Sequence, residues 1–470
     1  MKRLKICVLL PDYSTTTVDY QYYDPPRDLS KLLPECSFTT VFLNKLTTYS
    51  QLKNLSKQNF DIYINLCEGY LEWEVPSIEV PYFLELLGLP FTGPTSSLYD
   101  PEKTLMKYVA FTQDVLTPAH TLLKTTDELE KQVASLSYPM FVKPAKAGDS
   151  LGITAASKVS DSLALRYQAE EILKEFDEAL VEEYISGREF TVLVIADPTD
   201  PAKVISFTPV EYIFPEGFDF KTYELKTSSL HPDSNIKVED TELSQRIRTA
   251  AEKIFRGFNG SGYARMDFRM DEKGDLFFLE VNFTCSVFYE NAYEGSADHI
   301  LNNDPVGKSG FLELIINEGL SRYRRKKKCY DIKGNAISGY GIYANRDIRK
   351  DEVIFKGEER PQRIVTLDYV KHNWDEDQQR DFRHYAYPVG NDVYVLWSDD
   401  ARDWAPQNHS CSPNTAYAGL NVIALCDIPK GEELTLDYAE LLDHTAAAFN
   451  CNCNSASCRG EIKGKQIAVD

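Results

Sequence analysis

The chain has 470 residues, of which 43% are hydrophobic and 12% aromatic, and its formal net charge is −21 at pH 7. This length predicts about two to four domains, and the apolar content excludes a largely disordered chain. The acidic charge disfavours a protein that wraps nucleic acid, because phosphate binding needs a basic surface.

The sequence shows no run of about 20 apolar residues, so we expect no membrane partner. Its ten cysteines are sparse for a chain of this length. Four of them cluster near the C-terminus, and six are scattered singly, which is typical of a reducing compartment and predicts a cytoplasmic location. We expect the six scattered cysteines to be small core residues.

Residues 1–100 alternate apolar runs at 5–10, 60–66 and 89–91 with stretches that have helical periodicity. Alternating strands and helices are typical of βαβ units. This region is therefore expected to form a small parallel sheet.

Residues 101–328 are predicted to form a helix at 103–111, a strand at 140–143, a helix at 161–175 and a strand at 179–185. More strands and an amphipathic helix at 241–258 follow, and Asn259-Gly260 is a good stop for that helix. Residues 291–328 look helical and end in a basic run at 322–328. We interpret this run as a solvated helix end or linker rather than a nucleic-acid patch.

From about residue 330 onward the predicted strands are short and turn residues are frequent, which is typical of a small mixed β fold. The expected fold class is therefore α/β plus mixed β. We expect boundaries that divide the chain into residues 1–100, 101–320, a basic linker at 321–332, 333–445 and a tail at 446–470.

A lysine and a glycine-containing turn follow one another in the second region. Lys143 ends an apolar strand, and the turn at 148–152 contains Ser150. A strand lysine and a flexible glycine loop can bracket a triphosphate, with the loop amides as donors. Lys107, four residues after Lys103 on a helix, can reach the same phosphates. The alternative is that these are ordinary solvated lysines.

A predicted hairpin carries three oxygen ligands. Its strands at 262–268 and 277–282 flank a turn, and they present Asp267, Glu280 and Asn282 at facing positions. Glu280 and Asn282 share a face because strand side chains alternate with period two. Such a set suits Mg²⁺ bound with ATP phosphates. The alternative is a hairpin with ordinary surface acids, but the apolar neighbours of Glu280 favour a bound cation.

These motifs, together with the segments at 61–69 and 87–94, resemble the ATP-grasp superfamily and its D-alanine–D-alanine ligase-like branch over about residues 1–320. The resemblance implies an α/β subdomain at 1–100, two α+β subdomains at 101–320, and a ligase that phosphorylates a carboxylate with ATP before an amine attacks. It also implies residue roles. Phosphates contact Lys107, Lys143 and Ser150; adenine contacts Glu182, Glu183 and Ile185; ribose contacts Glu189; and Arg265 stabilises the oxyanion.

Two segments depart from that family. The loop after the first strand, Pro11-Asp12-Tyr13-Ser14, lacks the pattern Gly-Gly-x-Ser-x-Glu, and Phe283-Thr284-Cys285-Ser286 stands where the ligases have a Pro-Gly turn. Both departures concern the substrate. They argue against D-alanine and for a different amino acid, peptide or protein tail.

The C-terminal cysteines have the number and spacing of a zinc site. Three of them lie within eight residues, and one lies upstream: Cys451, Cys453, Cys458 and Cys411. Zinc prefers four such ligands in a tetrahedron. The alternative of four unrelated buried cysteines is disfavoured by this close spacing.

The region at 330–460 resembles the SET-domain family of protein lysine methyltransferases with its zinc-binding post-SET tail. The motif at 338–344, the pair Asn408-His409 and the segment at 433–438 occur in the family's order. The resemblance implies S-adenosylmethionine bound by Gly339, Tyr340, Gly341, Asn408 and His409. It also implies that the Tyr438 hydroxyl lies near the transferring methyl, although a core tyrosine is the alternative. The chain departs from the family's pattern at Pro406-Gln407 and at Asn454. These departures bear on the identity of the substrate more than on the type of reaction.

The sequence thus predicts a bifunctional enzyme whose cofactors are ATP, Mg²⁺, S-adenosylmethionine and zinc. Its partner would be a protein or peptide lysine, or an amino-acid-like small molecule. One rival hypothesis makes the ATP-grasp half a non-catalytic module that presents a target to the SET half, which Lys143 and the three oxygen ligands argue against. The other makes the SET half a zinc-stabilised interaction domain, which Asn408, His409 and Tyr438 argue against.

Overall fold

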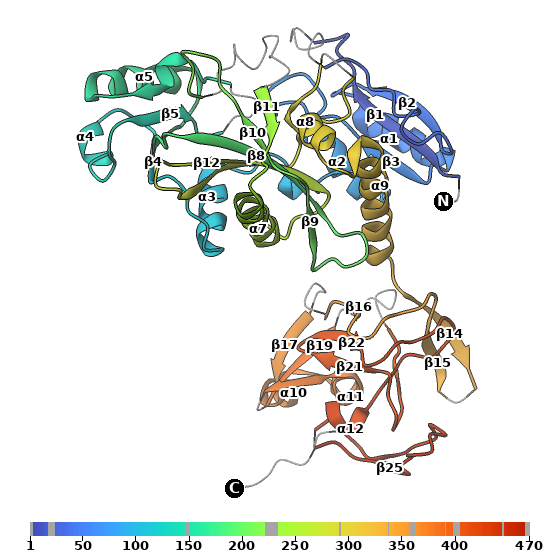
Figure 1. Cartoon of the computed structure of the whole chain (residues 1–470). Helices are drawn as coiled ribbons and strands as arrows, with labels where there is room; N and C mark the ends of the chain where they lie inside the picture. The colour runs from blue at the N-terminus through green and yellow to red at the C-terminus, as the bar shows by residue number, and fades with distance from the viewer. Residues whose placement is uncertain are drawn as a thin grey trace. The chain divides into compact units, whose positions relative to one another are not determined.

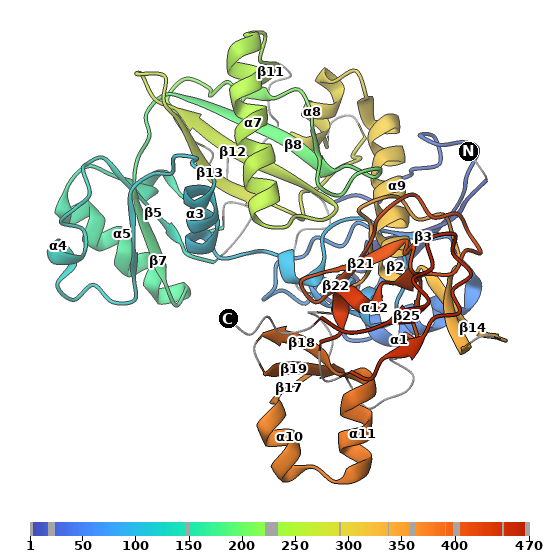
Figure 2. The same cartoon turned by 90° about the horizontal axis from the view of Figure 1, so that it is seen from below.

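The computed structural model describes residues 3–16, 24–146, 151–220, 234–290, 293–336, 338–357, 362–390, 392–397, 405–443 and 446–465. Its contacts divide the chain into two compact units, Met1–Arg324 and Arg325–Asp470. Figures 1 and 2 label the elements of both units. Each unit is described by itself below.

The first unit begins with a three-stranded parallel sheet. The strands β1 (Lys5–Pro11), β2 (Ser37–Leu43) and β3 (Ile62–Asn65) have the order β2-β1-β3. Alternate residues of β1 face two cores, because strand side chains alternate. One core contains the helices α1 (Thr48–Leu55) and α2 (Glu79–Leu86), and the other contains α8 (Ser296–Asn303) and α9 (Gly307–Lys326).

The parallel sheet differs from the sequence prediction at two places. The expected strand at 89–91 is wrong, because this segment contributes only a single parallel bridge between Phe91 and Tyr63. The strand β2 was not predicted. Its side chains are mostly exposed or half-buried, so it lacks the continuous apolar run of a central parallel strand.

A second, four-stranded antiparallel sheet has the order β4-β7-β5-β6. Its strands are β4 (His120–Leu123), β5 (Met140–Pro144), β6 (Lys158–Val159) and β7 (Ala179–Glu183). The helix α5 (Ser162–Glu175) packs on it through residues spaced by three and four, Leu165, Ala169 and Ile172. The short helix α4 (Leu129–Gln132) adds Leu129 to the same core.

The third sheet of the first unit follows the path β11-β10-β8-β12-β13, with β9 paired to β8. Its strands are β8 (Arg188–Ala196), β9 (Val204–Ser206), β10 (Val210–Tyr212), β11 (Asn235–Lys237), β12 (Tyr263–Met270) and β13 (Leu276–Asn282). The helices α3 (Lys103–Thr112) and α7 (Thr241–Gly257) share a core with it, and Figure 1 shows α7 lying along one face. Short 3-10 turns occur at Ser56–Gln58, Ser96–Leu98 and Ala155–Ser157.

The second unit consists of short strands around a small apolar core. It contains small sheets with the strand orders β14-β15, β16-β22-β21, β17-β19-β18, β20-β23 and β24-β25. Two helices, α10 (Leu367–Asn373) and α11 (Glu376–Tyr385), form the hairpin seen beside β17 in Figure 2. The strands are β14 (Tyr330–Asn335), β15 (Gly339–Ala344), β16 (Val353–Phe355), β17 (Gln362–Thr366), β18 (Tyr387–Gly390), β19 (Val393–Trp397), β20 (Asn408–His409), β21 (Thr415–Ala418), β22 (Asn421–Ala424), β23 (Thr435–Leu436), β24 (Phe449–Asn450) and β25 (Glu461–Ile462).

Five of the six scattered cysteines are buried as expected, but Cys426 is exposed. It lies in the turn after β22, which carries the chain to the surface. Among the described residues, no helix has both the length and the apolar character needed to cross a membrane.

Candidate active sites

A pocket of about 110 Å³ lies between the second and third sheets of the first unit. Strands β5, β7, β8, β12 and β13 all contribute to its wall. Eight predicted site residues line it: Lys143, Glu182, Glu183, Ile185, Glu189, Arg265, Asp267 and Glu280. The structure therefore brings together residues that span about 140 positions of the sequence. Ser150, also predicted here, lies outside the described residues.

Two of the predicted phosphate-binding lysines meet on one carboxylate. Glu182 lies 2.7 Å from the Lys107 amine and 2.5 Å from the Lys143 amine, and all three side chains are buried. Burial alone would raise the pKa of Glu182, but the two cations outweigh it and lower that pKa to about 2. The carboxylate therefore stays ionised and holds both amines, of which that of Lys143 belongs to a residue that lines the pocket.

A third lysine, which was not predicted from the sequence as a site residue, lies near Lys107 and Lys143. Lys103 is buried on α3, one turn before Lys107, and burial lowers its pKa. The Glu280 carboxylate makes the largest contribution that opposes this lowering of the Lys103 pKa. The sequence signal that could have identified Lys103 is its spacing of four residues from Lys107, because residues four apart on a helix share a face. Of these three buried lysines, Lys143 lines the pocket, and a lysine amine suits a phosphate.

The predicted magnesium ligands lie on adjacent antiparallel strands. Asp267 pairs directly with Glu280, and Arg265 pairs with Asn282. Directly opposed side chains are close neighbours, so the three oxygen ligands face one small region. The Arg265 guanidinium donates to both Asp267 oxygens, at 3.2 and 3.1 Å. The donor set suits a hard divalent cation, and the contact between Arg265 and the predicted ligand Asp267 was not expected from the sequence.

Aromatic side chains form another part of the pocket wall. Phe141 and Tyr184 stack with ring centroids 6.1 Å apart, and Phe220 packs edge-on against Phe141 at 5.0 Å. Glu183 lies beside them and accepts a hydrogen bond from the Ser137 backbone amide at 2.8 Å. A flat apolar slot edged by a carboxylate suits a purine ring.

In the second unit, Asn408 joins the predicted glycine motif to the segment at 433–438. Its side-chain amide donates to the Tyr340 carbonyl at 3.0 Å and to Glu433 at 2.7 Å. A Cβ on Gly341 would lie 2.3 Å from the same Glu433 oxygen. Only glycine leaves room for this contact, so Glu433, which the sequence analysis did not select, fixes Asn408 against the glycine strand.

Tyr438 is the first residue of the short helix α12 (Tyr438–Leu441) rather than a strand end. Its hydroxyl donates to the Gln407 carbonyl at 2.5 Å, and its backbone amide donates to His409 Nδ1 at 3.1 Å. Burial raises the pKa of this hydroxyl to about 12, and Tyr385 adds to the shift. The phenol therefore stays protonated and able to donate at physiological pH.

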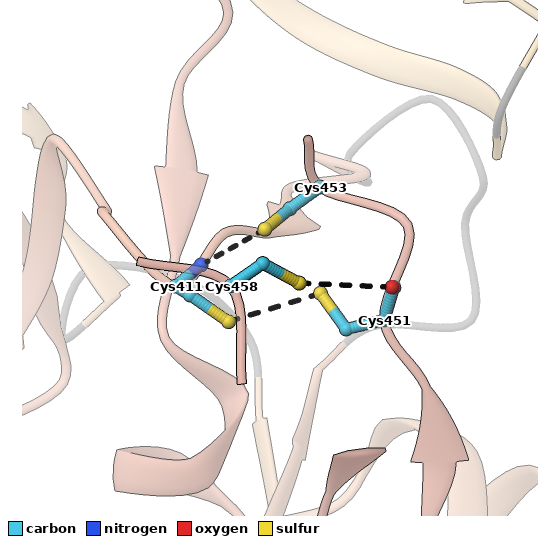
Figure 3. Close-up of side chains that lie close together, drawn as sticks. All are labelled: Cys411, Cys451, Cys453 and Cys458. Atoms are coloured by element: carbon cyan, nitrogen blue, oxygen red, sulfur yellow. Dashed lines mark hydrogen bonds between the residues drawn. The ribbon is translucent and has the colours of Figure 1, made fainter. Parts of the chain in front are cut away.

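The four predicted zinc ligands converge, as Figure 3 shows. The sulfur atoms of Cys411, Cys451, Cys453 and Cys458 all lie within 4.8 Å of one another. Sulfurs bound at about 2.3 Å in a tetrahedron are roughly 3.8 Å apart, and the Cys411–Cys451 separation is 3.8 Å. The residues present therefore fit zinc without rearrangement of the chain.

Two contacts connect this cysteine cluster to Tyr438. His409 Nε2 lies 3.4 Å from Cys411 Sγ, and Arg459 pairs with Asp437 at 2.5 Å. Asp437 directly precedes Tyr438 in the sequence. Arg459 was not selected from the sequence, and its place directly after Cys458 is the only signal that pointed to it.

Two family models match the chain. The model described as D-ala D-ala ligase C-terminus matches residues 105–290, and the model described as SET domain matches residues 339–439. These ranges contain all eight predicted site residues that line the pocket of the first unit and the Asn408–Tyr438 region of the second, respectively.

Curated relatives match the first unit. A D-alanine–D-alanine ligase of Dechloromonas aromatica is 31% identical over 240 residues, which is 50% of this chain and 75% of that protein. A D-alanine–D-alanine ligase B of Clostridium tetani is 35% identical over 234 residues, 45% of this chain. In that case the chain spans 61% of the relative's length.

Solved structures share the fold of the first unit. The D-alanine–D-alanine ligase of Bacillus anthracis complexed with ATP has a TM-score of 0.51 and 20% identity, over 69% of this chain and 99% of that one. The VanG D-Ala:D-Ser ligase of Enterococcus faecalis has a TM-score of 0.50 and 20% identity, over 68% of this chain and 100% of that one.

Proposed function

We propose that this chain, which belongs to the family of D-alanine–D-alanine ligases and carries a SET domain, is an enzyme with two activities. The first unit joins a carboxylate to an amine with conversion of ATP to ADP and phosphate. The second unit transfers a methyl group from S-adenosylmethionine to an amine, with a lysine side chain as the favoured acceptor.

The observation that supports the ligase activity is the pairing of Asp267 with Glu280 beside the buried lysines. Lys107 and Lys143 would neutralise the phosphates, and Asp267, Glu280 and Asn282 would hold Mg²⁺. The ion supplies charge that the phosphoryl oxygens need during transfer. Arg265 would then be released from Asp267 by the metal and would stabilise the negative charge that develops when the amine attacks.

The substrates of this half differ from D-alanine in our proposal. The relatives are named for D-alanine, but the loop at 11–14 and the segment at 283–286 lack the family's glycine-containing patterns. Cys285 is buried beside Arg265, so its side chain occupies space near the proposed reaction centre. We infer a carboxylate or amine partner of different shape, such as another amino acid or a peptide end.

The methyl-transfer proposal is supported by the position of Tyr438 between the Gln407 carbonyl and His409. S-Adenosylmethionine, held by the Gly339–Gly341 strand, Asn408 and His409, would supply an electrophilic methyl. The chain's own task is to deliver a neutral amine in line and to exclude water. A fixed, protonated Tyr438 and a backbone carbonyl can orient that amine. Zinc in the four-cysteine site would stabilise the tail beside it.

We also propose a reducing, cytoplasmic location. All ten cysteines are free thiols, which agrees with such a compartment. The acidic first unit disfavours nucleic acid as a partner.

The experiment that tests this proposal uses the zinc-replete full chain. Calorimetry should detect Mg²⁺-dependent ATP binding and, separately, S-adenosylmethionine binding. Release of ADP is then measured against a panel of amino acids and peptides. Absence of ATP binding would favour a first unit that only presents a target, and absence of S-adenosylmethionine binding would refute the methyltransferase.

A further inference from the structure

Gln407, the residue before Asn408, carries a buried side-chain amide beside the proposed methyl-transfer site. It is 7% exposed, directly precedes β20 and belongs to no strand. Its backbone carbonyl accepts the Tyr438 hydroxyl at 2.5 Å. Pro406, the residue before it, has no amide hydrogen and cannot donate a backbone hydrogen bond. A side-chain contact is therefore a direct means of fixing the position of the Gln407 carbonyl.

A relay of two hydrogen bonds holds this amide. Gln407 Nε2 donates to the Thr415 hydroxyl at 2.7 Å, and that hydroxyl donates to the Thr435 carbonyl at 2.7 Å. Thr415 begins β21 and is fully buried, and Thr435 begins β23. The relay therefore ties Gln407 to two strands of the second unit.

Chemistry fixes the direction of each hydrogen bond in this relay. A carbonyl oxygen can only accept, so the single proton of the Thr415 hydroxyl is committed to the Thr435 carbonyl. The hydroxyl must then accept from Gln407, and only the nitrogen of the side-chain amide can donate. The Gln407 side chain is consequently held in one orientation, with Nε2 toward Thr415.

The other polar atom of the same amide shows that this arrangement has a cost in stability. Among the residues that the structure describes, Gln407 Oε1 is buried and has no hydrogen-bond partner. A buried acceptor without a donor is unfavourable, and an aliphatic side chain of similar size would avoid that cost. An apolar residue would therefore serve folding at least as well, so the amide points to a role beyond stability.

We propose that Gln407 is a positioning residue for methyl transfer: its amide, held by Thr415, fixes the backbone carbonyl that receives the Tyr438 hydroxyl. This inference rests on the proposed methyl-transfer function, and it goes beyond that function by giving a role to a side chain at which the chain departs from the family's pattern.

The relay should affect the rate of methyl transfer more than cofactor binding. The Tyr438 hydroxyl orients the acceptor amine, so a small displacement of the carbonyl that holds it lowers the rate. Asn408 is held separately, through its contacts with the Tyr340 carbonyl and Glu433. The affinity for S-adenosylmethionine should therefore change little when the relay is broken.

The first measurement needs no methyl acceptor. In the zinc-replete full chain, with an isotope label at Cζ of its tyrosines, the NMR signal of Tyr438 is the one that Tyr438→Phe lacks. Gln407→Met removes the amide donor and Thr415→Val removes the hydroxyl, so both variants should shift this signal. Thr415→Ser is the matched control, because it keeps the hydroxyl and should leave the signal at its wild-type position.

The second measurement is the formation of S-adenosylhomocysteine by the same proteins, with saturating S-adenosylmethionine and a panel of lysine peptides. Gln407→Met and Thr415→Val should each lower kcat roughly tenfold, whereas Thr415→Ser should restore most of the rate that Thr415→Val loses. In a Tyr438→Phe background, Gln407→Met should slow the reaction no further, because no hydroxyl remains to be held. If Gln407→Met does not fold, Thr415→Val and Thr415→Ser test the same relay.

Three results would overturn the inference. An unshifted Tyr438 signal in Gln407→Met and Thr415→Val would show that the relay does not hold the hydroxyl. An unchanged kcat in both variants would show that the relay does not reach the reaction. Equal slowing of the wild-type protein and of Tyr438→Phe by Gln407→Met would assign Gln407 to packing alone. Absence of S-adenosylhomocysteine formation by the wild-type protein would refute the proposed methyl transfer itself, and it is distinguishable because the NMR shift does not depend on turnover.

Discussion

Glu433 accepts a hydrogen bond from the Asn408 side-chain amide at 2.7 Å, and the same carboxylate oxygen occupies the space where residue 341 would carry a Cβ. Three motifs that lie up to 92 residues apart in the sequence are thus fixed by one carboxylate. The arrangement explains why a glycine stands at position 341, and it makes Glu433 a support for the proposed cofactor site.

Removal of this support should weaken cofactor binding. Asn408→Ala and Glu433→Ala should each reduce the affinity for S-adenosylmethionine roughly tenfold, because each removes the half-buried hydrogen bond that holds Asn408 in place. Glu440→Ala is the matched control, since Glu440 is exposed and pairs with Lys465 at the surface. Calorimetry measures all three. An unchanged affinity in both site variants would contradict the assignment of this region.

Tyr438→Phe should slow methyl transfer at least tenfold while the cofactor remains bound, because only the hydroxyl that orients the amine is lost. The pH profile gives an independent check. The pKa of Tyr438 is raised to about 12, so its hydroxyl stays protonated throughout the working range. The rate should therefore rise with pH as the acceptor amine loses its proton, with no decline up to about pH 10. A decline between pH 8 and about 10 would mean that the tyrosine ionises in that range, contrary to this account.

The cysteine cluster should hold about one zinc ion per chain. The double change of Cys451→Ser and Cys453→Ser should abolish that zinc and lower the melting temperature of the second unit, because metal binding contributes to folding. Cys426→Ser is the control, since Cys426 is exposed and outside the cluster. Metal analysis of the purified proteins measures the number of zinc ions per chain in the wild type and in each variant. Full retention of zinc by the double variant would show that the ion binds elsewhere.

Nucleotide binding in the first unit should depend on Mg²⁺ through Glu280. Glu280→Gln should weaken Mg–ATP binding and ADP release by at least tenfold, because a neutral amide replaces an anionic ligand. Glu272→Gln, on the exposed turn of the same hairpin, should have no effect. Titration of the protein with ATP, with and without Mg²⁺, measures this dependence. Equal ATP affinity in both conditions would exclude the proposed metal site.

Arg265→Ala should separate binding from chemistry. The Arg265 guanidinium contacts Asp267, whereas the phosphates are assigned to Lys107 and Lys143. The affinity for ATP should therefore change little. Acyl transfer should slow by about a hundredfold, as expected when one donor to a developing oxyanion is lost. Comparing the dissociation constant of Mg–ATP with the turnover rate tests this. A large loss of affinity with unchanged turnover of the bound complex would reverse the role assigned to Arg265.

The sequence predicted the parts of these sites that lie on regular elements. The period of two along β13 predicted that Glu280 and Asn282 face together, and the cysteine spacing predicted the four-sulfur cluster. Contacts between distant segments could not be predicted. The approach of Glu433 to Gly341 depends on the packing of separate strands.

The central claim is that one chain carries two independent catalytic sites. The most direct test measures ADP and S-adenosylhomocysteine formed by the same purified chain, incubated with Mg–ATP, S-adenosylmethionine and a panel of amino acids and peptides. This account predicts that both products form, that Glu280→Gln reduces only ADP formation, by at least about tenfold, and that Tyr438→Phe reduces only S-adenosylhomocysteine formation. The absence of either product across the panel, or ADP formation that Glu280→Gln leaves undiminished, would contradict it.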